Sequence, residues 1–599
     1  MEDKVKLRSE IDDKFKWKVD KICSSNEVFE EELEQLKKDA PVLLNHKDKL
    51  GEKESLLAYL KDYEKYTRKL ETLYVYASMK SHEDTANNVQ QVIQSKVAQY
   101  AAEYSAMVSY FVPELLSLPE ETIKGYLNDA DLSGYKFFIE SVVKEKPHVL
   151  SKEKEELLAA LSDSLNAPDE IFSIFTNADM TFKDVEDEEG KMHPLTEGSY
   201  STYIKSKDRI LRKNAFLELF NTYGAFKNTL GQTLSSSMNT FNLRAKLRKY
   251  GSPIEASLSP NNIPLAVYDN SLETVSEGVK ALHRYVDIKK KLLGLDELHM
   301  YDLYVPIIDV PDVDISFEEG VEMAVRGLSP LGEDYLSIFK EGVSTGWIDI
   351  YENKGKMSGA YSSGTYDTAP YILLNYHNDL RDVSTLVHEM GHSIHSYYSR
   401  KNQPYIYGDY TLFVAEVAST TNEKLLIHYQ ITEEKDPLKK LYLVNQELEQ
   451  IRTTVFRQLM FAEFEKVTHE TIHAGTPMTG EDYNELWLKL NRKYFGEGIV
   501  IDKEIEIEWA RIPHFYSDFY VYQYATGYAA ASAFAESILT NGQESVDKYL
   551  GFLKSGGSNY PVETLKTAGV DMTSKAPLEA TIRRFDELLD MLQGFIENK

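Results

Sequence analysis

The residues best suited to chemistry in this 599-residue chain are His388, Glu389 and His392, which form an HExxH pattern. Side chains four residues apart lie on one face of a helix, so the two imidazoles can provide two ligands to one zinc ion. Glu389 follows the first histidine directly and can take a proton from a water molecule at the metal. The pattern predicts a helix over residues 381–400 that carries a catalytic metal site.

A second HExxH pattern runs from His469 to His473, so the flanking residues must decide which pattern binds metal. Directly after it, residues 474–477 are Ala-Gly-Thr-Pro, a sequence that ends a helix. We therefore interpret His469 and His473 as surface or core histidines.

Glu416 is the predicted third zinc ligand. It is the only charged residue between Thr411 and Thr421, and a carboxylate among apolar side chains needs a positive partner. His392 lies eight residues before Arg400, and Glu416 lies eight residues after Gly408. An antiparallel pair of helices would bring the two side chains to the same level.

Glu423, one heptad beyond Glu416, would face the same way and orient a ligand histidine through a hydrogen bond. His395 is the rival third ligand, or else a residue that supports a ligand or faces the substrate. A ligand from a separate helix closes a tetrahedron more easily than three ligands from one helix, which favours Glu416. The metzincin pattern is excluded because it needs Gly at 395 and His at 398, where this chain has His395 and Tyr398.

The segment before the predicted zinc helix is the most strand-like part of the chain. Residues 347–351 and 370–376 are β-rich runs, joined by a Gly-rich stretch that is typical of a loop. A strand at this place can pair along its edge with an extended peptide. It can equally belong to a small structural sheet with nothing bound.

A tyrosine-rich stretch over residues 509–535 contains candidate hydrogen-bond donors, namely His514, Tyr520, Tyr522, Tyr524 and Tyr528. Hydroxyl and imidazole groups that point into a cleft can donate to the oxyanion that forms when water attacks a peptide carbonyl. Tyrosines in such helices also pack in cores. We expect His514 and at least one tyrosine to act as donors.

Composition restricts the partners and the compartment. The formal net charge of −29 argues against nucleic acid and anionic membranes as partners. Cys23 is the single cysteine, which excludes an internal disulfide framework and fits a reducing cytosol. There is no export signal in the first residues and no run of about 18 apolar residues. We expect a cytoplasmic protein, and its oligomeric state stays open.

Most of the remaining chain has helical periodicity. In residues 85–111, apolar side chains recur every three or four positions, which predicts a helix that packs this stripe in a core: Val89, Ile93, Val97, Tyr100, Tyr104, Val108 and Phe111. Short alternating runs about Glu189 and Gly190 predict a β-hairpin.

Three stretches together carry a family resemblance: HEMGHSIH from His388, FVAEVAST from Phe413, and WARIPHFYSDFYVYQYATGYAAA from Trp509. They resemble the thimet-type zinc oligopeptidases of peptidase family M3. The segments LYVYASMKSHED (73–84) and GKMSGAY (355–361) resemble the oligoendopeptidase F branch of that family. The resemblance implies a mainly α, two-lobed helical body that encloses a deep substrate channel, with a small β-sheet beside the zinc helix.

The same resemblance implies three segments: an N-terminal helical hairpin region (1–115), a second helical segment ending in a small hairpin (116–200), and a catalytic zinc-peptidase domain (201–599). It implies one zinc ion per chain, with the ligands His388, His392 and Glu416. Glu389 would be the general base, and Glu423 would support a ligand.

For the remaining roles, the resemblance implies that His514 and Tyr528 are catalytic donors. The spacing before Gly527 differs by one residue from that of thimet oligopeptidase, which leaves the choice of tyrosine open. The implied substrate-binding residues are Tyr520, Tyr522, Tyr524, Gly359, Ala360 and His395.

These inferences predict a zinc-dependent endopeptidase that hydrolyses internal bonds of short unstructured peptides, with Glu389 as general base. One alternative is a zinc carboxypeptidase of similar helical build, which needs a free substrate C-terminus. The other is a non-catalytic peptide-binding protein that uses zinc structurally.

Overall fold

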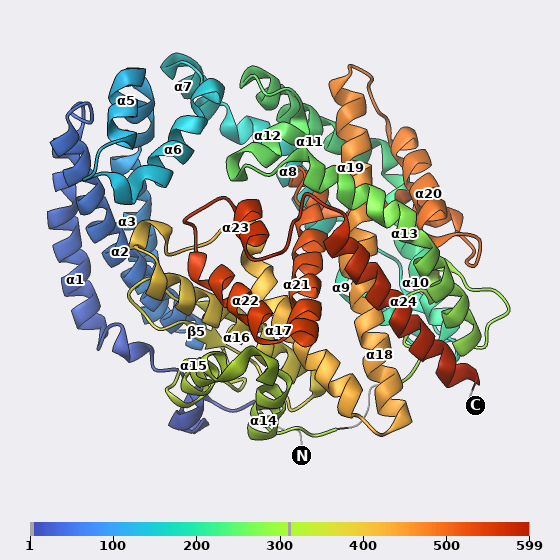
Figure 1. Cartoon of the computed structure of the whole chain (residues 1–599). Helices are drawn as coiled ribbons and strands as arrows, with labels where there is room; N and C mark the ends of the chain where they lie inside the picture. The colour runs from blue at the N-terminus through green and yellow to red at the C-terminus, as the bar shows by residue number, and fades with distance from the viewer. Residues whose placement is uncertain (1–4, 310–312, 598–599) are drawn as a thin grey trace. The chain divides into compact units, whose positions relative to one another are not determined.

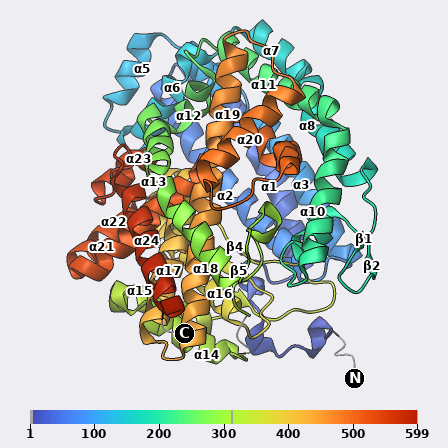
Figure 2. The same cartoon turned by 90° about the vertical axis from the view of Figure 1, so that its right-hand side faces the viewer.

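The computed structural model describes residues 5–309 and 313–597. Within these residues, almost all regular structure is helical, and the strands form two small sheets (Figures 1 and 2). The prediction of a mainly α fold with a small sheet near the zinc helix is confirmed. None of the described helices combines the length and apolar character needed to cross a membrane.

The chain forms two compact units, each assembled from three stretches of sequence. The first unit comprises Met1–Lys146, Asp312–Tyr429 and Phe534–Gly569, and the second comprises Pro147–Pro311, Gln430–Ala533 and Val570–Lys599. The predicted division into three successive segments and the predicted substrate channel stay predictions.

The first unit contains the helices and strands of the N-terminal region and of the HExxH region. They are α1 (Asn26–Asp39), α2 (Lys53–Glu83), α3 (Asn88–Val108), α4 (Phe111–Ser117), α5 (Glu120–Leu127), α6 (Lys136–Lys144), α14 (Phe317–Gly327), α15 (Gly332–Ser344), β3 (Ile348–Asp349), β4 (Tyr361–Ser363), β5 (Tyr371–Leu373), α16 (Leu380–Asn402), α22 (Gln543–Ser555), α23 (Pro561–Thr567) and α17 (Leu412–Glu433) as far as Tyr429.

The second unit contains the middle of the chain, the tyrosine-rich region and the C-terminal helix. Its elements are α7 (Lys152–Ala160), α8 (Ser162–Ile174), β1 (Val185–Glu186), β2 (Met192–His193), α9 (Glu197–Tyr203), α10 (Arg209–Ala225), α11 (Lys227–Leu247), α12 (Pro253–Leu258), α13 (Leu265–Leu292), α18 (Pro437–Ile451), α19 (Arg457–His473), α20 (Gly480–Phe495), α24 (Ala576–Glu597) and the part of α21 (Tyr522–Asn541) before Phe534. Strands β1 and β2 pair antiparallel, which confirms the predicted hairpin.

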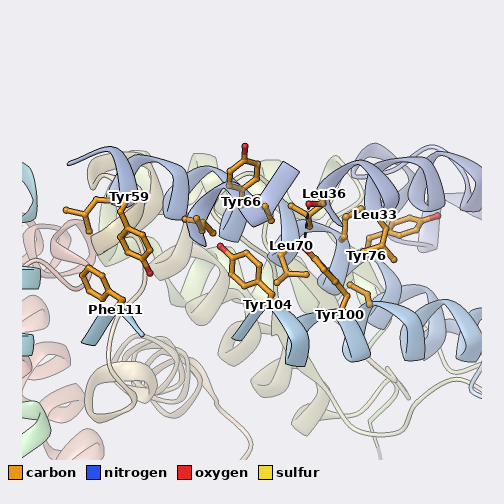
Figure 3. Packing of buried hydrophobic residues seen from close by; sticks show 14 of the residues in the cluster. Leu33, Leu36, Tyr59, Tyr66, Leu70, Tyr76, Tyr100, Tyr104 and Phe111 are labelled. Atoms are coloured by element: carbon orange, nitrogen blue, oxygen red, sulfur yellow. Dashed lines mark hydrogen bonds between the residues drawn. The ribbon is translucent and has the colours of Figure 1, made fainter. Parts of the chain in front are cut away.

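Helices α1, α2 and α3 enclose an apolar core in the first unit (Figure 3). Five residues of the predicted stripe, Ile93, Val97, Tyr100, Tyr104 and Phe111, are buried in it. Val89 is 60% exposed, so the prediction that it packs in the core is wrong; it lies in the first turn of α3. The helix also ends before Phe111, which begins α4.

The sheet beside α16 has the strand order β3–β5–β4, with β3 parallel and β4 antiparallel to the central strand. Strands β3 and β5 fall inside the two predicted β-rich runs but are shorter than predicted. Strand β4 (Tyr361–Ser363) lies in the stretch for which the sequence predicted a loop. Its Ser-rich segment has weak strand propensity and is a strand because its backbone pairs with β5.

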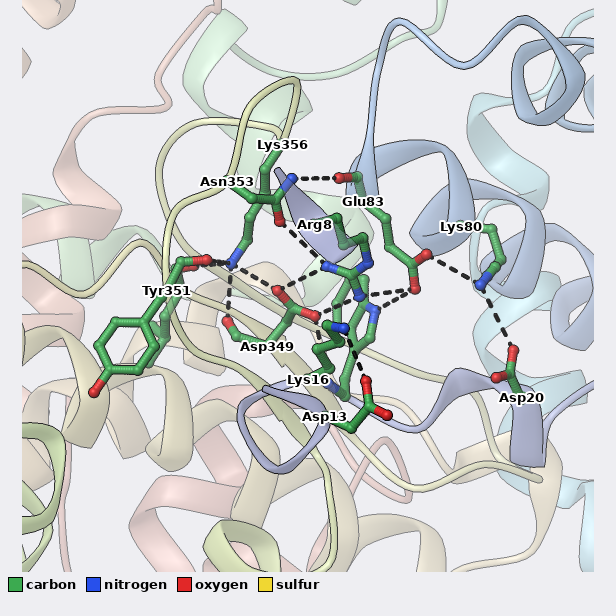
Figure 4. Close-up of polar contacts among 12 residues, drawn as sticks. Arg8, Asp13, Lys16, Asp20, Lys80, Glu83, Asp349, Tyr351, Asn353 and Lys356 are labelled. Atoms are coloured by element: carbon green, nitrogen blue, oxygen red, sulfur yellow. Dashed lines mark hydrogen bonds and ion pairs between the residues drawn. The ribbon is translucent and has the colours of Figure 1, made fainter. Parts of the chain in front are cut away.

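Buried ion pairs hold the loop that leads to β4 (Figure 4). Both oxygens of Asp349 accept bonds from Arg8, at 2.7 and 3.2 Å, and one also pairs with the fully buried ammonium of Lys356 at 2.8 Å. Lys356 donates further to the carbonyls of Tyr351 and Leu374. These contacts fix the GKMSGAY segment against the sheet.

Candidate active site

Helices α16 and α17 bring three potential metal ligands together in the first unit. Nε2 of His388 and Nε2 of His392 are 3.2 Å apart, and each is 3.5 Å from Oε2 of Glu416. Three donors placed about 2.0–2.2 Å from a tetrahedral zinc ion lie about 3.3–3.6 Å from one another. The triangle therefore has the dimensions that zinc requires. Across residues 5–309 and 313–597, it is the one group of His, Cys, Asp and Glu side chains with this spacing.

The close approach of the two helices depends on Gly391. A Cβ atom at this position would lie 2.6 Å from Cα and 2.8 Å from N of Ser419 on α17, closer than real side chains approach a backbone. Asn422 of α17 also donates a 2.9 Å hydrogen bond to the carbonyl of Val387 on α16. The glycine lets α17 lie against α16 at the level of the ligands.

Glu423 fixes the orientation of the first histidine. Its Oε1 is 2.9 Å from Nδ1 of His388, which leaves Nε2 to face the other donors. Burial alone would lower the pKa of His388, but the bond to Glu423 and the charges of Glu389 and Glu416 raise it to about 9. Without metal the imidazole therefore holds a proton at neutral pH, and a zinc ion has to displace it.

Glu389 is a buried carboxylate next to the triangle, with 7% of its surface exposed. Burial raises its pKa, and the nearby charges of His388 and His392 act in the opposite direction. Burial also raises the pKa of Glu416, but its bond to His392 and the histidine charges outweigh this and lower it to about 2. The ligand carboxylate is thus ionised, while the neighbouring carboxylate is tuned toward exchanging a proton.

These groups line a cavity of about 510 Å³. One part of its lining is the segment from Ala360 to Gly364, which contains β4, and residues of α16 and Tyr410 form another part. In the described part of the chain β4 pairs only with β5, so one of its edges has no strand partner. Gly359 and Ala360 also line a neighbouring cavity of about 310 Å³, and Ala360 contributes to both.

His395 is not brought to the other two histidines. Its ring is 1% exposed and stacks on Tyr410 with centroids 3.6 Å apart, and burial lowers its pKa to about 3. Glu416, the predicted ligand, takes the third position of the triangle. Tyr410, Ser396 and Arg400 also line the cavity and were not predicted as site residues. For Ser396 and Arg400, the available signal was their position on the HExxH helix.

In the second unit, three of the predicted donors form a cluster. His514, in the short 3-10 helix Pro513–Tyr516, has its Nε2 3.5 Å from the hydroxyl of Tyr524, and its ring stacks parallel to that of Tyr520. Tyr522 and Tyr528 are 1% and 2% exposed. The choice of Tyr528 as donor stays a prediction.

The second HExxH pattern is a structural element of the second unit. His469 is fully buried, its Nδ1 bonds Asn242 at 2.8 Å, and its ring lies against Phe519. His473 is exposed at the last residue of α19. These placements match the interpretation of the two residues as a core and a surface histidine.

Comparison with known proteins identifies the family. A family model described as peptidase family M3 matches residues 202–584, and one described as oligopeptidase F matches residues 114–182. The chain belongs to peptidase family M3. As a member of this family it is a metallopeptidase, and the resemblance inferred from its sequence is confirmed.

Family M3 relatives match along nearly the whole chain. Oligopeptidase PepF of Bacillus subtilis (strain 168) is 46% identical over 591 residues, which cover 98% of this chain and 88% of the relative. The plasmid-encoded oligoendopeptidase F of Lactococcus lactis subsp. cremoris is 40% identical over 596 residues, which cover 99% of both.

Solved structures show the same M3 fold. The crystal structure of oligoendopeptidase-F from Enterococcus faecium is 37% identical, covers 95% of this chain and 99% of its own, and has a TM-score of 0.74. A crystal structure from Chlamydophila abortus is 36% identical, covers 99% of this chain and 100% of its own, and has a TM-score of 0.95. The group formed by His388, His392 and Glu416 is consistent with the zinc site of a family M3 metallopeptidase.

Proposed function

We propose that this chain is a zinc endopeptidase that cleaves internal bonds of short unstructured peptides. The observation that carries the proposal is the triangle of His388, His392 and Glu416 beside the buried carboxylate of Glu389 in one cavity. The relatives' names, which include oligopeptidase and oligoendopeptidase, support peptides as the substrate class.

The three ligands would hold one zinc ion per chain, which when bound lowers the pKa of a water molecule and polarises the scissile carbonyl. Glu389 accepts a proton from the attacking water at its carboxylate. It then donates that proton to the nitrogen of the leaving amine. Its burial supports this role because a carboxyl group with a raised pKa can both take and release a proton near neutral pH.

Glu423 keeps His388 in one orientation through the bond to Nδ1. Ser419 donates a 2.9 Å hydrogen bond to Oε2 of Glu416 and restrains the third ligand in the same way. The chain's own contribution at this site is a set of donors that need little rearrangement on binding metal.

The peptide would bind in extended form along the edge of β4. Backbone N–H and C=O groups of Tyr361–Ser363 can pair with the substrate and fix its direction. Gly359 and Ala360, at the start of this wall, remain proposed substrate-binding residues, as does His395.

His514 and Tyr528 are the proposed donors to the oxyanion, with Tyr520, Tyr522 and Tyr524 as proposed substrate-binding residues. The family resemblance supports these roles, and the cluster of His514 with Tyr520 and Tyr524 makes those two tyrosines competing donors. Tyrosine-to-phenylalanine variants at 520, 524 and 528 show which of the three tyrosines is the donor. The donor is the residue whose loss lowers kcat by about 10²-fold or more without raising KM.

A cytosolic location stays a prediction.

The test is hydrolysis of an internally quenched peptide that is blocked at both ends, before and after chelation of metal and restoration of zinc. We expect internal cleavage that stops on chelation and returns with zinc. Release of residues only from a peptide with a free C-terminus would indicate a carboxypeptidase instead. Binding without cleavage of either peptide would favour a non-catalytic peptide-binding protein.

A further inference from the structure

Arg400 is a cation in the cavity that the proposed mechanism does not use. It lies in the last turn of α16, eight residues beyond His392, and lines the same cavity as the three metal ligands. Its side chain is only 14% exposed. A guanidinium group carries five N–H donors and keeps its charge at every pH at which proteins function, so its burial calls for acceptors.

The acceptors that the protein provides do not satisfy this group. Nη2 donates to the carbonyl of Gly364 at 3.1 Å and lies 3.3 Å from Oδ1 of Asp409, whose side chain is 79% exposed. Nε and Nη1 are buried and have no hydrogen-bond partner among the described residues. Glu71, a second carboxylate close enough to interact with Arg400, accepts a 2.8 Å bond from the hydroxyl of Tyr405.

The position of Arg400 at a helix end does not explain its burial. A cation in the last turn of a helix interacts favourably with the helix dipole while it stays in solvent. Lys401, the next residue, does this: it is exposed, with Nζ near the hydroxyl of Tyr397. Arg400 instead lines the cavity, and its Nη2 bonds the carbonyl of Gly364 in the wall that contains β4.

We propose that Arg400 binds a carboxylate group of the peptide substrate. A carboxylate matches the planar, two-pronged geometry of a guanidinium group, and in the cavity it would compete with the exposed Asp409 for Nη2. Eight residues of helix span about 12 Å, and an extended peptide advances about 3.3 Å per residue. The carboxylate therefore lies three or four residues from the cleaved bond. This inference rests on the proposed peptidase function and adds a substrate preference to it.

Two chemical groups can supply the carboxylate: an acidic side chain or the peptide's own C-terminus. An acidic side chain would make Arg400 a determinant of sequence preference. If the carboxylate is the C-terminus, Arg400 would determine how many residues before its C-terminus a short peptide is cleaved. Both use the same contact, and matched peptides tell them apart.

The experiment compares kcat/KM for quenched peptides that are all cleaved at the same bond. Mass spectrometry of the products confirms which bond is cleaved in each peptide. In one series a single Asp or Asn is moved along the peptide on both sides of the bond. In the other series the C-terminus is free or amidated at increasing distance from the bond. For the wild type we expect a carboxylate three or four residues away to raise kcat/KM by about tenfold or more, the size of a charge-assisted hydrogen bond.

Three variants assign this gain to Arg400. Arg400→Gln should abolish this gain, so that matched charged and neutral peptides are cleaved at equal rates, and Arg400→Lys should keep part of the gain. Lys401→Gln removes one positive charge from the adjacent exposed residue and should keep the whole gain in kcat/KM. Zinc content is measured for each variant to show that the metal site is intact.

The proposal is overturned if the wild type gains nothing from a carboxylate at any position. It is also overturned if Arg400→Gln slows charged and neutral peptides by the same factor, because a purely structural role has that result. If the wild type cleaved none of the peptides, the proposed function would fail separately. Fluorescence anisotropy of the same labelled peptides on the zinc-loaded protein would then test the Arg400 contact without turnover.

Discussion

Replacing Gly391 with alanine should separate helices α16 and α17 at the level of the metal ligands. The new Cβ would lie 2.6 Å from Cα of Ser419, and ordinary contact begins at 3.4 Å, so the helices must move apart by about 0.8 Å. The obstacle is backbone and cannot rotate away. Because Glu416 lies three residues before Ser419 on the same helix, its carboxylate shifts together with the backbone of Ser419.

The expected effects on stability and on zinc binding differ in size. Overpacking costs about 1–3 kcal/mol, while alanine gains about 1 kcal/mol over glycine in helix propensity. The net loss of folding stability is therefore about 0–2 kcal/mol. Ligand distances, however, must stay within about 0.2 Å of their usual values, and a displacement of about 0.8 Å exceeds that tolerance. We expect a folded protein with strongly weakened zinc affinity.

Zinc affinity is measured by competition with a chromophoric chelator, and stability by denaturant unfolding of the metal-free protein. Gly551→Ala is the matched control, since Gly551 is an exposed residue of α22 with no atom within 4 Å of the added Cβ. It should be neutral or stabilising and keep full zinc affinity. Wild-type zinc affinity and activity in Gly391→Ala would refute the argument that this glycine sets the ligand geometry.

Three further predictions follow from named contacts. Glu423→Gln should lower zinc affinity about 10–100-fold by weakening the bond that orients His388, and an unchanged chelator titration would contradict this. Because the pKa of His388 is raised to about 9 in the metal-free protein, zinc binding at pH 7 should release a proton, seen as a buffer-dependent heat in calorimetry; equal heats in all buffers would disprove it. The pKa of Asp349 lies below its ordinary value of 3.8, because Arg8 and Lys356 outweigh the effect of burial. Its stabilising contribution is present above about pH 3.8 and is lost as the pH falls through the folded-state pKa. Asp349→Asn should therefore lower the Tm at pH 7, and the difference from wild type should shrink below pH 3.8; a Tm difference independent of pH would rule this out.

The site was predictable from sequence to the extent that its geometry is local. Ligands four residues apart on one helix need only the helical period, and Glu416 was recognisable as a single charge in an apolar helix that turns back on α16. Glu423 followed from the same helical repeat. The structure brings all of these side chains together.

Features that depend on tertiary contacts were not predictable in this way. Strand β4 has little strand propensity and forms through pairing with β5, and the sequence places Arg400 only at the end of a predicted helix. Val89 fits the apolar period of its helix but lies in its exposed first turn. Periodicity states which residues share a face of a helix, whereas the neighbours of that face depend on the rest of the fold.

The tyrosine-rich region illustrates the same limit. Tyr520, Tyr522, Tyr524 and Tyr528 are equivalent in type, and the sequence could not rank them by exposure. In the second unit Tyr520 and Tyr524 gather around His514, whereas Tyr522 packs against Tyr268 with ring centroids 5.0 Å apart.

The most direct test of the central claim is the zinc content and peptidase activity of Glu389→Gln. The variant should retain one zinc ion per chain, because Glu389 is not a ligand, and should lose about 10³-fold or more in kcat, because the general base is gone. Glu470→Gln changes the corresponding residue of the second HExxH pattern, which is exposed, and should keep full activity. Near-normal turnover by a zinc-loaded Glu389→Gln would contradict the proposed mechanism.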